Sequence, residues 1–271
     1  MHHVFSAWAD ISRRLGEARH VLLLSDYDGT LTPIVDRPEL ADLAENTRRI
    51  LQALARQRNL TVGIVSGRAL GDLYNRVRVR GIVYAGNHGL EIEGPGVSFV
   101  NPLAEDIRPV LRLLHQVLSR ALSTMKGVLV EDKGLTLSVH YRLVEEEKAK
   151  EVWSIFDRIV GAARSVGKVR ATSGKKVLEV RPAIPWDKGR AIALLQERYQ
   201  KRFHKRKVLT IFLGDDTTDE DGFKVVEKGD GISIFVGEEN TGSRARYYLR
   251  SPAEVQEFLA RLQGRWRQPS R

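Results

Sequence analysis

Asp26 and Asp28, two carboxylates near the start of the chain, are the first residues whose types and spacing suggest chemistry. They directly follow an apolar segment that ends at Ser25. In an extended chain, side chains two positions apart point the same way, so the pair could share one cation. Gly29 lets the chain turn sharply after them. Asp-Gly also occurs in ordinary turns, so the pair alone does not establish a metal site.

A second acidic cluster lies between Gly214 and Asp221, again directly after an apolar segment. Two groups of carboxylates at the ends of two buried strands would repel each other unless a cation lay between them. The chain has no cysteine, and oxygen ligands with room for water and phosphate favour Mg²⁺. Acidic residues also favour the start of a helix, but that does not account for Asp215 and Asp216.

Two further segments suit a phosphate group. Ser66, Gly67 and Arg68 follow an apolar segment and precede a helical pattern, which would place a hydroxyl and backbone N–H groups at a helix N-terminus. Lys188, at another helix start, could set a positive charge against a phosphoryl oxygen. Singly, Ser66 is typical of a helix cap and Lys188 of a solvated surface. Together with the carboxylates they predict a phosphate site.

A sheet must position these residues. Helical periodicity, as in Thr47 to Gln57 and Lys188 to Tyr199, separates segments that are typical of buried strands. Those segments are Val21 to Ser25, Leu60 to Val65, Ile82 to Ala85, Val208 to Leu213 and Ile232 to Val236. Strands alternating with helices predict an α/β fold with a doubly wound parallel sheet, in which ligands bind beyond the carboxyl ends of the strands.

The middle of the chain has a different order. From 102 to 181 the pattern predicts helix, strand, strand, helix, strand and strand, with a hairpin turn at Asp132 to Gly134. Such an αββαββ unit is a compact α+β module. We therefore expect residues 102–181 to form a domain inserted into a core made of residues 1–101 and 182–271.

Composition limits the class of protein. The chain has 271 residues, 42% of them hydrophobic, which is enough for a globular core. No apolar run approaches the roughly 18 residues of a membrane span, and Met1 to Asp10 does not resemble an export signal, so we expect a cytoplasmic protein. The formal charge of +10 attracts anions in general, from nucleic acid to phosphorylated metabolites.

Taken together, these motifs resemble the haloacid dehalogenase superfamily of phosphatases. They are DYDGTLTP from Asp26, SGR from Ser66, the lysine of DKG at Lys188 and GDDTTDE from Gly214, and they span most of the chain. Within that superfamily the chain is similar to the trehalose-6-phosphate phosphatases. The segments that carry this similarity are Gly86 to Gly89, Val130 to Gly134, His140 to Arg142 and Val177 to Pro182, in or beside the inserted module, which that family uses as a cap.

The resemblance implies a role for each core motif. Asp26 would attack phosphorus, while Asp28 would donate a proton to the sugar oxygen and later take one from water. The implied magnesium site consists of Asp26, Asp28, Asp215 and Asp219, with Asp28 contributing its backbone carbonyl and Asp219 acting as a ligand or as a ligand's neighbour. The phosphoryl oxygens would be bound by Thr30, Ser66 and Lys188. Direct coordination by Asp216 stays open.

Sugar selectivity is expected from charged groups, because a disaccharide phosphate presents many hydroxyls and little apolar surface. The resemblance places Arg68 and His88 at the rim that faces the cap. The candidate substrate-binding residues of the cap are Glu131, Lys133, Arg142, Lys175 and Glu179. Glu131 and Lys133 match the family's E-x-K element, whereas simple solvation is an alternative for Arg142 and Lys175.

Other functions are less well supported. A related phosphatase acting on sucrose phosphate or mannosyl-phosphoglycerate would share the core, but the elements around Glu131 and His140 disfavour it. A nucleic-acid-binding or regulatory protein could use the basic run Lys201 to Lys207, although such runs are more often solvated loops. A receiver domain would leave the inserted module unexplained. We therefore expect a small sugar phosphate as the partner, no nucleic acid or membrane, and a monomer.

Overall fold

The computed structural model describes residues 1–174, 176–203, 208–238 and 242–267. The chain forms two compact units, one made of Met1–Phe99 with Trp186–Arg271 and the other of Val100–Pro185. None of the helices in these described ranges is long and apolar enough to cross a membrane.

The first unit is built on one sheet with the strand order β1-β13-β12-β11-β2-β3-β4-β5-β6. Its strands are β1 (His2–His3), β2 (His20–Ser25), β3 (Leu60–Val65), β4 (Val83–Gly86), β5 (Glu91–Gly94), β6 (Val97–Val100), β11 (Val208–Gly214), β12 (Ile232–Val236) and β13 (Tyr247–Leu249). Neighbouring strands from β1 to β4 are parallel, and β5 is antiparallel to β4. The doubly wound α/β fold predicted from the sequence is confirmed.

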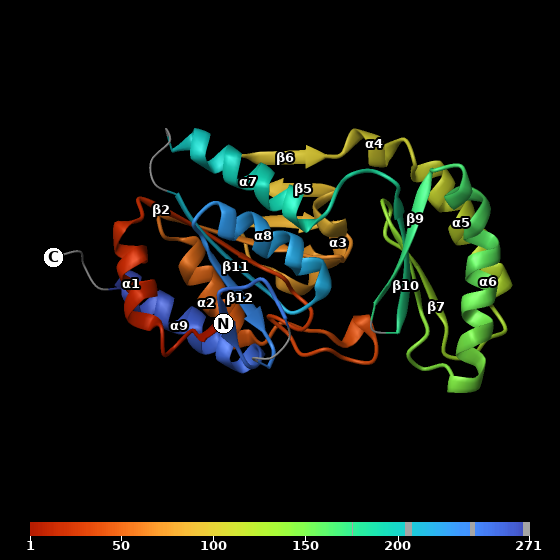
Figure 1. Ribbon diagram of the computed structural model, residues 1–271, viewed down its shortest axis with the longest axis horizontal. Helices are drawn as coiled ribbons and strands as arrows, with labels where there is room; N and C mark the ends of the chain where they lie inside the picture. The colour runs from red at the N-terminus through yellow and green to blue at the C-terminus, as the bar shows by residue number, and fades with distance from the viewer. Residues whose placement is uncertain (175, 204–207, 239–241, 268–271) are drawn as a thin grey trace. The chain divides into compact units, whose positions relative to one another are not determined.

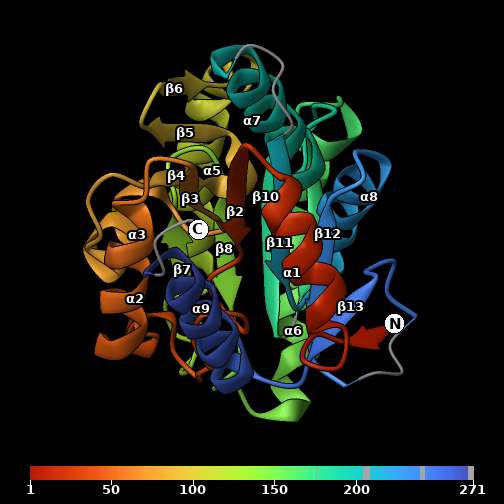
Figure 2. The same cartoon turned by 90° about the vertical axis from the view of Figure 1, so that its left-hand side faces the viewer.

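Helices cover both faces of this sheet (Figures 1 and 2). One face packs against α1 (Trp8–Glu17), α2 (Glu45–Ala55), α3 (Leu70–Val77) and α9 (Pro252–Arg267), and the other against α7 (Lys188–Arg202) and α8 (Glu220–Lys228). Leu23 packs toward the first face and its neighbours Leu22 and Leu24 toward the second. Because both faces are buried, the strands are continuous apolar runs. Short 3-10 turns are η1 (Pro38–Leu40), η2 (Asn87–Gly89) and η3 (Thr217–Asp219).

Three central strands end at the same level. In the parallel registers, Ser25 of β2 lies opposite Leu213 of β11 and Ile64 of β3. The backbone N–H of Asp26 then donates to the carbonyl of Leu213 over 2.8 Å. The segments that follow β2, β3 and β11 therefore leave the sheet at one edge, where parallel sheets bind their ligands.

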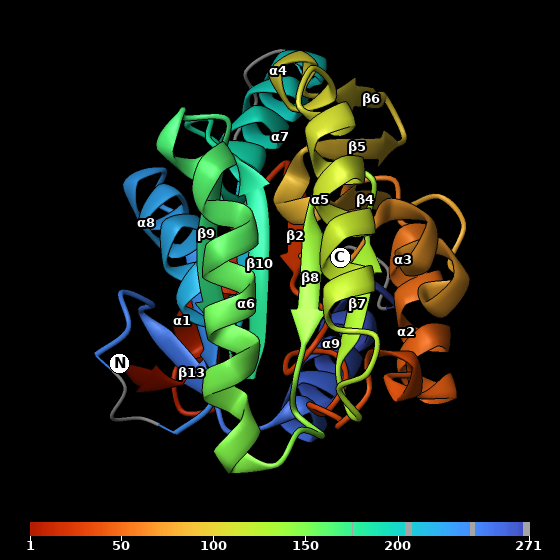
Figure 3. The ribbon, with the colours of Figure 1, turned by 90° about the vertical axis from the view of Figure 1, so that its right-hand side faces the viewer.

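The second unit has an antiparallel sheet in the order β7-β8-β10-β9, with two long helices on one face (Figure 3). Its elements are α4 (Pro102–Glu105), α5 (Arg108–Ala121), β7 (Leu129–Asp132), β8 (Leu137–His140), α6 (Glu146–Ser165), β9 (Val169–Gly174) and β10 (Val177–Pro182). α4 and α5 are separate because Pro109, in the first turn of α5, has no N–H to continue a helix. Val139 and Leu178 pack with Phe156 of α6 in its core.

Candidate active site

Three carboxylates gather at the edge where β2 and β11 end. Asp26, Asp215 and Asp219 each offer an oxygen atom, and these atoms lie within 4.8 Å of one another. Asp26 is only 5% exposed and Asp219 is fully buried. Carboxylates this close repel each other, so oxygen ligands in this arrangement fit a hard divalent cation such as Mg²⁺. The carboxylates of Asp28 and Asp216 are outside this cluster in the described part of the chain.

Two glycines make room for the cluster. Gly29 has φ +81°, and a Cβ atom there would lie 2.2 Å from Oδ2 of Asp215. A Cβ atom at Gly214 would similarly lie 2.3 Å from Cγ of Asp219. Because both glycines lack a side chain, a carboxylate can lie close to the backbone at each position. Gly29 also adopts a conformation that other residues rarely adopt.

Lys188 lies inside the cluster. Its Nζ donates to Oδ1 of Asp26 and to Oδ1 of Asp219, each over 2.7 Å. Lys188 is the first residue of α7, which Asp187 caps by accepting a hydrogen bond from the N–H of Arg190. The lysine is 3% exposed, so the alternative of a solvated surface residue is wrong.

With all three carboxylates ionised, the site carries more negative charge than Lys188 can neutralise. Burial raises the pKa of Asp26 well above its usual range, with Lys188 opposing and the other two carboxylates adding to the rise. Burial likewise raises the pKa of Asp219. Burial would lower the pKa of Lys188, but Asp219 and Asp26 outweigh it and the pKa rises. One lysine among three carboxylates leaves negative charge that a divalent cation would neutralise.

Asp219 also orders the turn after β11. Its Oδ2 accepts the backbone N–H groups of Asp215 and Asp216, both at 3.1 Å. Its Oδ1 is the oxygen bound by Lys188. Both oxygens of Asp219 are thus engaged by the protein, which favours the role of neighbour to a metal ligand over that of direct ligand.

The carboxylate of Asp28 is held by Arg68. Nε and Nη2 of the guanidinium donate to the two carboxylate oxygens, each over 2.7 Å. The same guanidinium lies 5.4 Å from the centre of the Tyr27 ring. Arg68 was expected at the rim of the site, and the structure shows in addition this two-pronged contact, which leaves the backbone of Asp28 as its route to a metal.

Thr30 and Ser66 are two of the buried hydroxyl residues at this edge. Thr30 is fully buried, and its Oγ1 has no hydrogen-bond partner within the described residues. A buried hydroxyl normally has a partner, so Thr30 suits an oxyanion such as a phosphoryl group. Ser66 does not cap a helix, because α3 begins at Leu70, and its Oγ instead accepts the N–H of Arg68 over 3.2 Å.

A strained turn after β4 brings His88 to the same place. Asn87, His88 and Gly89 have φ values of 49°, 58° and +82°, and such conformations cost about 1–3 kcal/mol each for residues other than glycine. The N–H of His88 donates to the carbonyl of Ser66 over 2.8 Å. A Cβ atom at Gly67 would lie 2.7 Å from the His88 ring, so the glycine of the SGR motif admits that ring.

The second unit has its own network of charges. Glu131 lies 2.8 Å from Nε2 of His140. Glu179, 7% exposed, accepts a hydrogen bond from Nε of Arg181 over 2.5 Å and has Nζ of Lys133 at 3.8 Å. Arg181 was not predicted from the sequence, although its spacing from Glu179 along a strand places both on one face. Arg142 lies in the turn after β8, and Lys175 lies outside the described residues.

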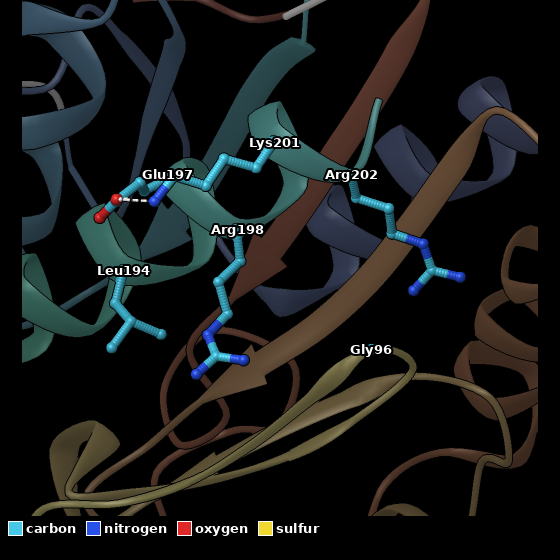
Figure 4. Close-up of a pocket in the computed structure, with 6 residues that line it drawn as sticks. All are labelled: Gly96, Leu194, Glu197, Arg198, Lys201 and Arg202. Carbon is cyan, nitrogen blue, oxygen red and sulfur yellow. Dashed lines mark hydrogen bonds and ion pairs between the residues drawn. The ribbon is translucent and has the colours of Figure 1, made fainter. Parts of the chain in front are cut away.

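A cavity of about 900 Å³ lies elsewhere in the first unit, between α7 and the turn from β5 to β6 (Figure 4). It is lined by Gly96, Leu194, Glu197, Arg198, Lys201 and Arg202. Lys201 pairs with Glu197, and Arg202 donates to the carbonyl of Pro95. The first residues of the basic run therefore belong to a helix rather than a loop, where cations suit the C-terminal end of the helix dipole. Residues 204–207 of that run lie outside the described ranges.

Comparison with known proteins gives a consistent family. The family model described as trehalose-phosphatase matches residues 24–255. The chain is 35% identical over 275 residues to a probable trehalose-phosphate phosphatase 3 of Oryza sativa subsp. japonica, covering 94% of this chain and 73% of that protein. It is 36% identical over 266 residues to a probable trehalose-phosphate phosphatase D of Arabidopsis thaliana, covering 94% and 70%.

The fold also matches a solved structure. The C-terminal domain of the trehalose-6-phosphate phosphatase from C. albicans superposes with a TM-score of 0.81 at 24% identity, covering 94% of this chain and 96% of that one. At that identity the similarity supports the fold alone.

Proposed function

Because the chain belongs to the trehalose-phosphatase family, we propose that it hydrolyses trehalose 6-phosphate to trehalose and phosphate through an aspartyl phosphate on Asp26, the last step of trehalose biosynthesis. The observation that carries the proposal is the position of Asp26. It is buried at the end of β2, bound by Lys188, and part of a three-carboxylate cluster. This combines a nucleophile, a fixed cation and a metal site at one edge of the sheet.

Asp26 supplies the attacking oxygen. Lys188 holds Oδ1, so Oδ2 forms the bond to phosphorus while the bond from phosphorus to the sugar oxygen breaks. Asp28 would give its proton to that sugar oxygen once one of its two oxygens has left the contact with Arg68 and carries a proton. In the second step water attacks the same phosphorus, Asp28 takes a proton from the water, and phosphate leaves with Asp26 restored. Thr30, Ser66 and Lys188 bind the phosphoryl oxygens.

Mg²⁺ fits the three-carboxylate cluster and, when bound, would neutralise charge on the phosphoryl group. Asp26 and Asp215 would hold it through side chains and Asp28 through its carbonyl. Asp219 keeps Lys188 and the turn after β11 in place, as its hydrogen bonds indicate. Phosphoryl transfer depends largely on such positioning and charge neutralisation.

Sugar selectivity is assigned to the second unit. Its candidates are Glu131, Lys133, Arg142, Lys175 and Glu179. The candidates for substrate binding in the first unit are Arg68 and His88. The pairing of Glu179 with Arg181 and Lys133 supports a fixed acceptor for sugar hydroxyls, because the two cations approach different oxygens of the carboxylate and so restrict its rotation. We place the enzyme in the cytoplasm as a monomer, where charged sugar phosphates that do not cross membranes would be available.

The test is a panel of sugar phosphates assayed for phosphate release with Mg²⁺ and with a chelator. Trehalose 6-phosphate should be preferred over glucose 6-phosphate, sucrose 6-phosphate and mannosyl-phosphoglycerate, and release should stop with the chelator. If another sugar phosphate were preferred, the assignment as a phosphatase would stand, but trehalose 6-phosphate would be rejected as its substrate. If none of the esters released phosphate with Mg²⁺ present, the proposed phosphatase activity would be rejected.

A further inference from the structure

Asp72, in the first turn of α3, is in contact with the arginine that holds Asp28. Its Oδ2 accepts a hydrogen bond from Nη1 of Arg68 over 2.6 Å. Arg68 therefore uses Nε and Nη2 for Asp28 and Nη1 for Asp72, and its side chain is only 9% exposed. All three nitrogens of the guanidinium are engaged by two carboxylates from different elements of the first unit.

Asp72 is itself held in place. Nε of Arg76, one turn further along α3, donates to both of its oxygens over 2.8 and 2.9 Å. Arg76 is anchored in turn, because its Nη1 donates to the carbonyls of Glu39 and Ala41. The hydroxyl of Tyr27 binds the same carbonyl of Ala41 over 2.8 Å. The chain of contacts thus returns to the residue that precedes Asp28.

The geometry of this chain has a consequence for Asp28. A guanidinium plane that binds both oxygens of a carboxylate fixes the rotation of that carboxylate. The plane of Arg68 is fixed by its third nitrogen and by the ring of Tyr27. Removing the contact at Nη1 would take away one of the charged contacts that hold this long side chain, which has four rotatable bonds.

We propose that Asp72 is a positioning residue, which acts through Arg68 to hold the carboxyl group of Asp28 where the sugar oxygen departs. The proposal deepens the proposed function and rests on it. The plain alternative is that Asp72 only stabilises α3, as an acidic residue in a first turn with an arginine four positions later.

Two esters with different leaving groups separate these roles. Trehalose leaves as an alkoxide that must be protonated, whereas p-nitrophenolate leaves without a proton. Asp72→Asn should slow formation of the aspartyl phosphate from trehalose 6-phosphate about 10-fold, a part of the 10²–10⁴-fold that a placed general acid contributes. The rate of aspartyl phosphate formation from p-nitrophenyl phosphate, also measured by rapid quench, should change less than about 2-fold. Asp72→Glu should recover most of the loss.

Glu45→Gln is the matched control. Glu45 lies in the first turn of α2 and pairs with Arg48 and Arg49, at 2.7 and 3.1 Å, but does not contact Arg68. Glu45→Gln should therefore cost helix stability like Asp72→Asn while leaving both rates unchanged. Equal losses with both esters in Asp72→Asn, or a loss that follows its melting temperature alone, would overturn the positioning role.

A readout independent of turnover keeps the proposal testable if the proposed function fails. The Nε–H of Arg68, identified in ¹⁵N spectra by its disappearance in Arg68→Lys, should exchange slowly with water in the unaltered protein and in Glu45→Gln. In Asp72→Asn it should exchange at least about 10-fold faster, since the guanidinium loses one of its anchors. Unchanged exchange in that variant would contradict the proposal, whatever ester the enzyme hydrolyses.

Discussion

A Cβ atom at Gly29 would lie 2.2 Å from Oδ2 of Asp215, so the carboxylate of Asp215 fills the space that any other side chain at position 29 would need. The glycine and the aspartate come from segments that follow different strands, β2 and β11. Their contact fixes how closely the two acidic motifs approach each other. A metal held by both motifs would depend on this approach.

Gly29→Ala should therefore lower activity at least about 100-fold, because the methyl group displaces Asp215 from the metal site as well as straining the backbone. Magnesium titrations followed by activity would measure the weakened binding. Gly81→Ala is the control: Gly81 has φ +80°, nearly the same backbone strain, but no atom lies within 4 Å of its Cβ position. Comparable loss in both variants would show that strain, not contact with Asp215, is responsible.

Asp26→Asn should abolish turnover while leaving the melting temperature within a few degrees of the original, because the amide keeps the size and loses the attacking charge. Asp28→Asn should slow both proton transfers and, if the second suffers more, accumulate the phosphoenzyme. Mass spectrometry of intact protein after rapid quench would detect the added phosphoryl group. Near-normal turnover in Asp26→Asn would exclude a covalent intermediate on this residue.

Asp215→Ala and Asp219→Asn should fail in different ways. Asp215→Ala removes a candidate ligand, so activity should respond only to much higher magnesium concentrations. Asp219→Asn alters the partner of Lys188, so kcat should fall even at saturating magnesium. Measuring how the activity of both variants depends on magnesium concentration tests whether Asp215 is a metal ligand and Asp219 a partner of Lys188. Identical magnesium dependence would show that both residues coordinate the ion or that neither does.

The central strands were predictable because each is buried on both faces. A strand such as β3, Leu60–Val65, is a continuous apolar run, and the structure keeps those bounds. β5, Glu91–Gly94, was not expected, because its glutamates and the Gly94-Pro95-Gly96 turn interrupt any apolar pattern. β1 and β13 are too short to leave a pattern.

The site was predictable to the extent that motifs at strand ends must meet at one edge of the sheet. That rule brings Asp26, Asp215 and Ser66 together. It does not say which way a side chain points, so the contacts of Arg68 with Asp28 and Asp72 were missed. The spacing of Arg68, Asp72 and Arg76, four residues apart each time, was the available signal.

His20 should make stability depend on pH. Burial, with a smaller contribution from the charge of Arg202, lowers the pKa of His20 to about 4. An unfolded histidine has a pKa near 6.5, so between these values the unfolded chain binds more protons and the free energy of unfolding falls as pH falls. The resulting decrease in the free energy of unfolding is about 2 kcal/mol between pH 7 and pH 5. In urea titrations His20→Gln should lose that part of the pH dependence, whereas His2→Gln, at an exposed position, should keep it.

Glu131→Ala and Lys133→Ala test where the sugar is selected. Asp26, Asp28 and Lys188 act on any phosphoryl group, so they cannot choose a sugar. Losing one hydrogen bond to a substrate hydroxyl costs about 1–3 kcal/mol, or roughly 5- to 150-fold in kcat/KM. Both variants should lose this much with trehalose 6-phosphate and much less with p-nitrophenyl phosphate.

The matched control for these two variants is Glu146→Ala, which breaks an exposed ion pair with Lys176 in the same unit, 2.8 Å long. It should leave kcat/KM for both esters within about 2-fold, because exposed pairs contribute little. The pair of Lys133 with Glu179 adds a second expectation: Glu179→Ala should impair the sugar ester as Lys133→Ala does, and the double variant should lose less than the sum of the two. If all these variants lose both activities equally, the second unit supports the fold and does not select the sugar.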